Sequence, residues 1–68
     1  MTNLINKVAE KFNGLVTSTD TVEFSFGGDT YVLTDGTLYA TLEDGSFLPG
    51  FKKVRTLKSV ETFVALRA

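Results

Sequence analysis

Acidic side chains beside glycines are the residues in this chain whose types and spacing could do chemistry. Three such pairs fall between residues 26 and 47: Gly28-Asp29, Asp35-Gly36 and Asp44-Gly45. Clustered carboxylates could hold a calcium ion, but a calcium loop needs its oxygen ligands within about twelve residues. Whole predicted strands separate these acids, and no G-x-G-x-x-G pattern precedes a helix to cradle a phosphate. We therefore interpret the pairs as hairpin turns, because glycine and aspartate tolerate the positive φ that two-residue loops require.

Acid–base catalysis is the other chemistry that carboxylates could support. A catalytic pair needs two carboxyl groups in different environments that face one cleft. Here most acids lie in or beside turns at opposite ends of a small predicted sheet. The chain also has no His and no Cys, which excludes imidazole and thiolate chemistry, zinc sites of that kind, and disulfides. We expect no enzymatic activity, no cofactor and no bound metal.

Charge is distributed unevenly along the sequence. Residues 12–51 contain acids but no Lys or Arg, whereas the segment that follows is basic. We call residues 52–58 the basic segment; its cations are Lys52, Lys53, Arg55 and Lys58. Two interpretations of the basic segment stay open. It could be a solvated surface whose charge complements that of the acidic part of the chain, within one subunit or between subunits, or it could contact nucleic acid. The net charge of -1 does not favour general affinity for DNA.

A helix is predicted over residues 3–13. Its apolar side chains Leu4, Ile5, Val8 and Phe12 recur at helical spacing. Asn13-Gly14 is a helix stop, because both residue types tolerate the left-handed conformation. A membrane-surface helix is the alternative, but core packing is favoured because the segment is short and carries only two lysines.

Strands are predicted over residues 21–26, 30–34 and 37–42, where apolar and polar residues alternate, after a Thr/Ser-rich connection. Two-residue turns then fix the pairs that lie opposite each other: Phe24 with Tyr31, Val22 with Leu33, Leu33 with Leu38, and Tyr31 with Ala40. A third turn at Asp44-Gly45 would pair Leu42 with Phe47 and add a short fourth strand. All these residues, with Phe26, would share one apolar face.

The last part of the chain is predicted to be a second helix. Pro49-Gly50 ends the meander, and Leu57, Val60, Phe63 and Val64 form a helical stripe after an N-cap at Thr56 or Ser59. Residues 1–68 should therefore form one α+β domain with the order α-β-β-β(-β)-α, an antiparallel meander with both helices packed on one sheet face.

This order of elements resembles that of double-stranded-RNA-binding domains. Such domains present basic residues at the start of their last helix, where this chain has Lys52, Lys53, Arg55 and Lys58. The resemblance is one of layout, so it implies a fold and no function.

The other sheet face is predicted to be polar except for Val32 and Tyr39, which lie opposite each other. Such a pair can be ordinary cross-strand stabilisation or the centre of an interface, where Tyr is enriched. A 68-residue chain without disulfides has a small core, and subunit association is a common additional stabiliser. Val32 and Tyr39 are therefore our candidate protein contact.

The function expected from the sequence is protein–protein binding with self-association, without catalysis. A nucleic-acid contact through the basic segment is the alternative. The N-terminus shows no basic leader and no long apolar run, so we expect a cytoplasmic protein without a membrane partner. A bacterial or phage auxiliary or inhibitor protein is compatible with the length.

Overall fold

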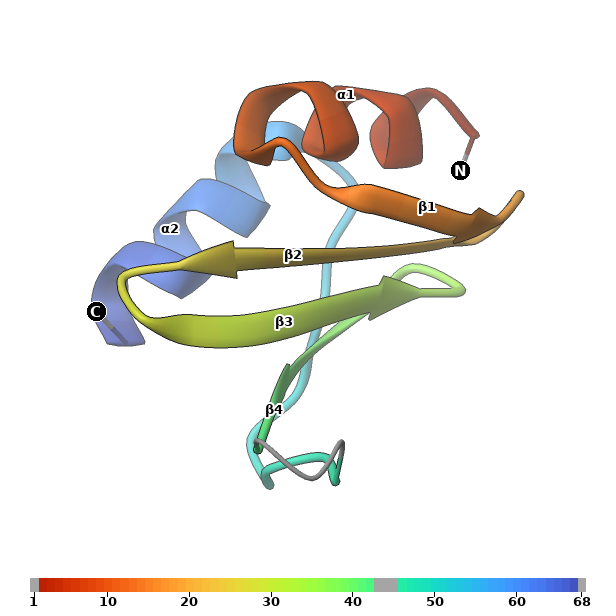
Figure 1. The fold of residues 1–68 in the computed structure, drawn as a ribbon. Helices are drawn as coiled ribbons and strands as arrows, with labels where there is room; N and C mark the ends of the chain where they lie inside the picture. Colours follow the sequence, from red (N-terminus) through yellow and green to blue (C-terminus); the bar gives the residue numbers. More distant parts are fainter. Residues whose placement is uncertain (1, 43–45, 68) are drawn as a thin grey trace.

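Five antiparallel strands lie between two helices along the chain, as a computed structural model shows (Figure 1). The structure describes residues 2–42 and 46–67. Its elements are α1 (Thr2–Phe12), β1 (Leu15–Ser18), β2 (Thr21–Phe26), β3 (Asp29–Thr34), β4 (Thr37–Thr41), β5 (Lys52–Lys53) and α2 (Leu57–Arg67). The strands follow one another in the sheet as they do in the chain. The predicted α+β fold with an antiparallel meander is confirmed.

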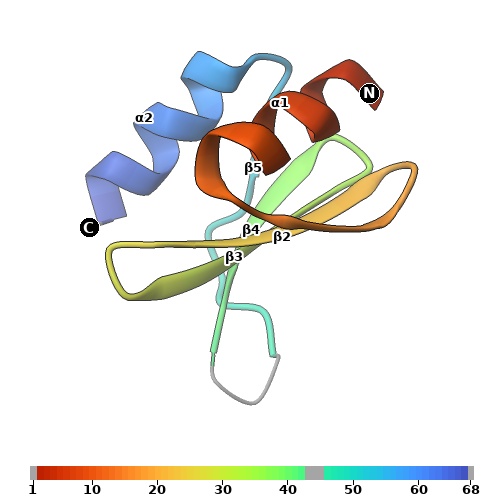
Figure 2. The ribbon, with the colours of Figure 1, turned by 45° about the horizontal axis from the view of Figure 1, so that its top comes forward.

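The core lies between the helices and one face of the sheet (Figure 2). Its buried side chains come from both helices, the three central strands and one residue after β5: Leu4, Ile5, Val8, Val22, Phe24, Tyr31, Leu33, Leu38, Ala40, Val54, Val60 and Val64. Burying each large aliphatic side chain contributes about 1.5–3 kcal/mol, so these residues are the main source of stability. The helical stripes predicted from residue spacing are the ones that face this core.

A run of aromatic rings connects the two helices through the core. Phe12 of α1 stacks on Phe24 at 4.6 Å between ring centroids, and Phe24 stacks on Tyr31 at 5.4 Å. Phe63 of α2 then meets Tyr31 edge to face at 6.3 Å. Offset stacks and edge-to-face contacts are the preferred aromatic geometries, so the run stabilises the docking of both helices.

The predicted stop of α1 is confirmed at Asn13, whose φ is 54°. The amide of Gly14 donates to the carbonyl of Ala9 at 2.8 Å, which is the bond that closes a Schellman motif. Gly14 also lies against β2, because a Cβ built on it would be 2.8 Å from the carbonyl oxygen of Glu23. Only glycine fits this close approach without a shift of the backbone.

The first two predicted hairpins are confirmed in register. β2 pairs Phe24 with Tyr31, and β4 pairs Leu38 with Leu33. Gly27, Gly28, Asp35 and Gly36 all have positive φ, as two-residue turns of the primed types require. These two glycine–acid pairs therefore act as turns, while Asp44-Gly45 lies outside the described residues.

The predicted pairing of Leu42 with Phe47 is wrong. Phe47 instead forms a bridge with Thr41, and the amide of Leu42 donates to the carbonyl of Ser46 at 2.8 Å. This register differs from the predicted one by a single residue. Because side chains alternate between faces along a strand, the difference moves Phe47 from the core face to the opposite face.

Two strands at the margins of the sheet were not predicted. β1 occupies part of the segment interpreted as a connection, and its pairing with β2 is irregular between Val16 and Ser18. β5 has only two residues, which pair with Thr37 and Leu38 of β4. Neither segment has the length or the clean alternation that makes a strand visible in a sequence.

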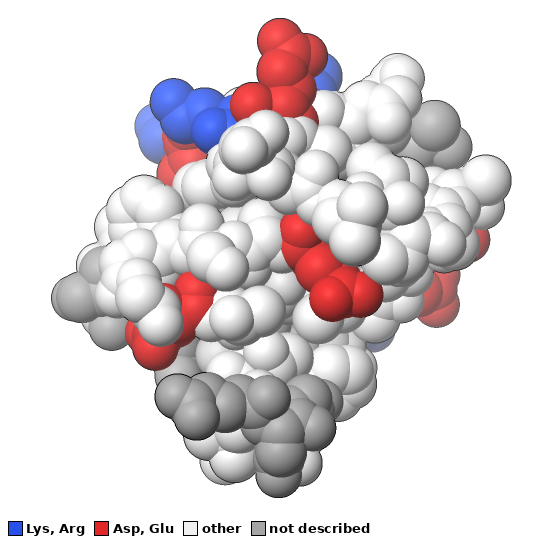
Figure 3. Space-filling view, in the orientation of Figure 1, with Lys and Arg blue, Asp and Glu red and all other residues white. Residues whose placement is uncertain are grey.

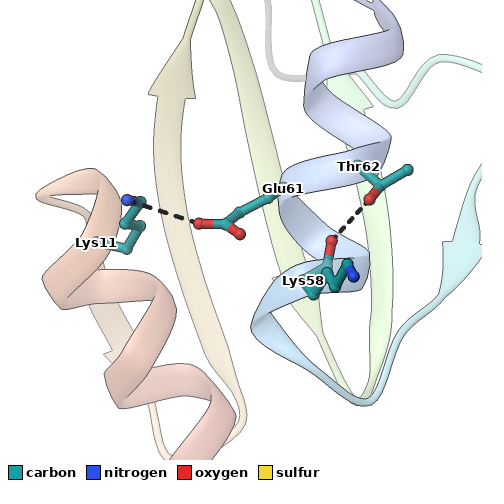
Figure 4. Close-up of polar contacts among 4 residues, drawn as sticks. All are labelled: Lys11, Lys58, Glu61 and Thr62. Atoms are coloured by element: carbon teal, nitrogen blue, oxygen red, sulfur yellow. Dashed lines mark hydrogen bonds and ion pairs between the residues drawn. The ribbon is translucent and has the colours of Figure 1, made fainter.

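The two helices also touch at the surface (Figure 4). The ammonium group of Lys11 in α1 lies 3.6 Å from a carboxylate oxygen of Glu61 in α2. Within α2, the hydroxyl of Thr62 donates to the carbonyl of Lys58 at 2.9 Å. The predicted cap at Thr56 is present, since its hydroxyl oxygen accepts from the amide of Ser59 at 3.2 Å. Among residues 2–42 and 46–67, neither helix has the length and apolar character needed to cross a bilayer.

Candidate functional site on the open face of the sheet

The sheet face turned away from the core is not covered by either helix, and we call it the open face (Figure 1). A row of neighbours in register crosses it from β1 to β4: Leu15, Glu23, Val32 and Tyr39. Val32 and Tyr39 lie directly opposite each other, as predicted, and both are half-buried. The candidate contact residues are thus neighbours at the β3–β4 part of this face.

Two exposed phenylalanines extend the pair into an aromatic cluster, which we define as Tyr39, Phe47 and Phe51. Phe47 stacks on Tyr39 with 4.5 Å between ring centroids and 13° between ring planes. Phe51 contacts the same ring at 5.6 Å and 41°. Phe47 is 54% exposed and Phe51 60% exposed, so the cluster presents apolar surface to solvent.

The sequence did not identify Phe47 and Phe51 as site residues. Phe47 was assigned to the wrong face by the one-residue difference in register. Phe51 directly precedes β5, a strand too short to be recognised, so its face could not be inferred from alternation. One signal was available: both residues are aromatic and flank the Pro49-Gly50 turn.

Threonines surround the aromatic cluster, and some of their hydroxyls are engaged within the sheet. Thr21 and Thr34 share a hydrogen bond of 2.9 Å between their hydroxyl oxygens, and the hydroxyl of Thr41 donates to the carbonyl of Thr30 at 3.2 Å. No polar or charged residue of the described chain is buried. The open face therefore has a partly apolar centre and a polar surround.

The structure divides the basic segment between different parts of the molecule. Lys53 pairs with Thr37, which lies two residues from Tyr39 in β4, so the alternation of side chains places Lys53 on the open face. Lys52 pairs with Leu38, a residue of the core face. Val54 is buried and its amide donates to the carbonyl of Gly36 at 2.9 Å. Arg55 and Lys58 follow this anchor and are both exposed, Lys58 in the first part of α2.

Acidic and basic side chains are unevenly distributed on the face of the molecule seen in Figure 3. In this view most basic side chains gather at the upper left, over the helices, with acidic side chains beside them, and further acidic side chains are spread over the sheet. By strand parity only Lys53 of β5 belongs to the open face, and Arg55 and Lys58 lie beyond the buried Val54, so the four cations of the basic segment do not form one patch there.

The carboxylates of the turns do not meet in a cleft. Asp20 and Asp35 lie at one end of the sheet, where the amide of Asp35 donates to the carbonyl of Asp20 at 3.1 Å, and both are exposed. Asp29 belongs to the turn at the other end of β2 and β3. No group of three acidic side chains within the described residues is placed to hold a metal ion.

Two shallow grooves of about 430 Å³ each are present, one between the helices beside Lys11 and one beside Leu15 and Glu23. Among the described residues, each groove is lined by a single carboxylate, Glu10 in the first and Glu23 in the second. A pair of carboxyl groups that share one cleft, the arrangement an acid–base mechanism needs, is not found in either groove.

Comparison of this chain with protein families, with curated proteins and with solved structures finds no match. The geometry of the open face is therefore the main guide to function.

Proposed function

We propose that this chain is a non-enzymatic binding protein whose open face docks onto another protein, and that it also self-associates. The observation that carries the proposal is the aromatic cluster: two phenylalanines that are more than half exposed flank Tyr39 on a sheet face without a covering helix. Large exposed apolar side chains that form a contiguous patch are typical of interaction sites.

The composition of the open face supports a protein partner. Aromatic residues are enriched in the centres of protein interfaces, and a polar rim usually surrounds them. Here threonines border the aromatic cluster, and Val32 extends its apolar centre across the neighbouring strand. Rigid aromatic side chains that are already stacked also lose little conformational entropy when a partner covers them.

A capture experiment with matched variants tests the docking proposal. Immobilised protein is incubated with an extract of the source organism, and bound proteins are identified by mass spectrometry. The variants are the double substitution Phe47→Ser/Phe51→Ser on the open face and Leu66→Ser on α2, a control whose side chain is 83% exposed. We expect a protein that is retained by the wild type and by Leu66→Ser and lost with the double variant. Equal capture by all three proteins would contradict docking through the open face.

Self-association is tested by light scattering on a size-exclusion column. The expected result is a mass of two subunits at micromolar concentration and a melting temperature that falls on dilution, because dissociation is linked to unfolding. A monomer whose melting temperature is independent of concentration would refute this part. An auxiliary or inhibitor protein of a bacterium or phage would be one example of such a binding protein.

Nucleic-acid binding is a second candidate function, favoured by one contact. Phe51 lies against Tyr39 and directly precedes Lys52-Lys53, so aromatic and basic side chains are contiguous along the β4–β5 margin. Aromatic platforms beside cations can stack the bases of single strands. A gel-shift titration at low and moderate salt, with Lys52→Gln/Lys53→Gln as the variant that should weaken binding, tests this. Absence of a shift at low salt, where phosphate contacts are strongest, would exclude it.

A further inference from the structure

The two margins of the sheet differ in how they are protected from pairing with another strand. β5 is two residues long, consists of Lys52 and Lys53, and follows the Pro49-Gly50 turn. Short length, lysines and a nearby proline are the features by which natural proteins block a sheet edge. The β5 edge is therefore closed to strand addition.

β1, at the other margin, has none of these protecting features. It runs for four residues, Leu15–Ser18, without a charge or a proline, and all four are exposed. Leu15 is 67% exposed and Val16 43% exposed. β2 pairs with one side of β1, and no described strand pairs with its other side. Two features would restrict pairing: the irregularity between Val16 and Ser18, which includes Thr17, and α1, which runs beside β1 (Figure 1). Leu15 and Val16 lie before the irregularity.

We propose that β1 pairs antiparallel with β1 of a second copy of this chain, so that two five-stranded sheets become one continuous sheet. The proposal rests on the self-association suggested above, but it assigns that association to an edge separate from the open face. Main-chain groups that β1 leaves unpaired would then be satisfied by the second copy, as in other cases of strand addition.

Side-chain parity and cross-strand packing together select the register of this pairing. A two-fold axis perpendicular to the sheet brings one residue of β1 opposite the same residue of the partner, and core faces must continue into core faces. Val16 pairs with the buried residue Val22, so it belongs to the core face. Parity permits an axis at Leu15, Val16 or Thr17, and Thr17 lies within the irregularity. We choose the axis at Val16, because it places two valines opposite each other on the core face, a β-branched pair that suits cross-strand packing.

A second copy fits this edge for reasons of symmetry and charge. A two-fold contact uses the same surface on both subunits and closes after one step. Because the β5 edge is blocked, growth would stop at a dimer and would not continue into a fibre. β1 also carries no charge, so two copies meet without repulsion between like charges at the contact.

Single cysteine variants test the register directly, because the chain has no cysteine of its own. Opposed residues of antiparallel strands have Cα atoms about 4.5–5.5 Å apart, which a disulfide can span. The variants are Val16→Cys in β1, Phe51→Cys on the open face and Leu66→Cys on α2. Under mild oxidation at micromolar concentration, we expect a disulfide-linked dimer of Val16→Cys alone on a non-reducing gel. Faster cross-linking of Phe51→Cys would overturn the proposal in favour of association through the open face.

A charge-swap experiment provides the second test. Val16→Lys and Val16→Glu should each be monomeric by light scattering, because each places two like charges opposite one another. An equimolar mixture should recover the dimer as a heterodimer, because the opposed charges then attract. A wild-type protein that is monomeric, or single variants that remain dimeric, would refute the proposal. Capture of a partner by the open face should be unchanged in Val16→Lys, so failure of the edge contact and failure of the docking proposal are distinguishable.

Discussion

Tyr39 of β4 and Phe47 stack nearly in parallel on the open face, with ring centroids 4.5 Å apart, although Phe47 lies outside the named strands and pairs with Thr41 as an isolated bridge. The stack therefore lies where regular strand pairing ends. It holds the segment around Phe47 against β4. The aromatic cluster has two roles on this basis: it fixes that segment and it presents apolar surface.

We expect Phe47→Ala to lower the free energy of unfolding by about 0.5–1.5 kcal/mol, the usual contribution of an aromatic pair. Phe47 is more than half exposed, so no core cavity forms and the larger cost of about 3–5 kcal/mol for a buried phenylalanine does not apply. Urea denaturation of Phe47→Ala and Phe24→Ala, the latter in the core, measures both. Equal losses in the two variants would show that Phe47 is packed as tightly as a core residue.

Gly14→Ala should destabilise the protein by roughly 1–3 kcal/mol, the typical cost of overpacking. An added Cβ would lie 2.8 Å from the carbonyl oxygen of Glu23 and 3.0 Å from a methyl carbon of Val22. Asn13→Gly is the matched control, because glycine adopts the positive φ at residue 13 without strain. It should change the unfolding free energy by less than about 1 kcal/mol. A neutral Gly14→Ala would mean that α1 can shift on β2.

Removal of the hydroxyl groups of Thr56 and Thr62 should have opposite effects on the stability of the protein. Thr56→Ala removes the oxygen that accepts from the amide of Ser59, and loss of such a cap costs about 0.5–2 kcal/mol. Thr62→Ala removes only a bond back to the carbonyl of Lys58, while alanine has the higher helix propensity. Thermal unfolding should show a lower melting temperature for Thr56→Ala and an equal or higher one for Thr62→Ala. The reverse order would contradict the assignment of the cap.

The ion pair between Lys11 and Glu61 should contribute little to stability. Lys11 is exposed and Glu61 is only half-buried, and pairs of this kind contribute about 0–1 kcal/mol. A double-mutant cycle with Lys11→Met and Glu61→Gln, measured at low and high salt, isolates the pair. A coupling energy well above 1 kcal/mol that persists in high salt would show that the pair is shielded from solvent.

The hairpins were predictable because their turn chemistry and their burial pattern indicate the same register. Gly27-Gly28 and Asp35-Gly36 supply the positive φ, and apolar residues such as Phe24 and Tyr31 then fall on one face. Val32 and Tyr39 follow on the other face by the same alternation, which is why half of the candidate site could be identified.

The rest of the site depends on structure that no local pattern specifies. Phe47 lies on the open face and not on the predicted core face, because its observed pairing differs from the predicted pairing by one residue. A shift of one residue along a strand always moves a side chain to the opposite face. Phe51 reaches Tyr39 because β5 is held beside β4, which depends on the burial of Val54 in the distant core. β1 is a strand because β2 offers it an edge, and its own exposed residues carry little signal.

The two tyrosines lie in different parts of the molecule, so their fluorescence can report on each part separately. The chain has two Tyr and no Trp, so tyrosine dominates its near-ultraviolet absorption and its emission. Tyr31 is fully buried between the aromatic rings of the core, whereas Tyr39 lies on the open face. Tyr31→Phe would leave emission that reports only on the open face, and Tyr39→Phe would leave emission that reports only on the core.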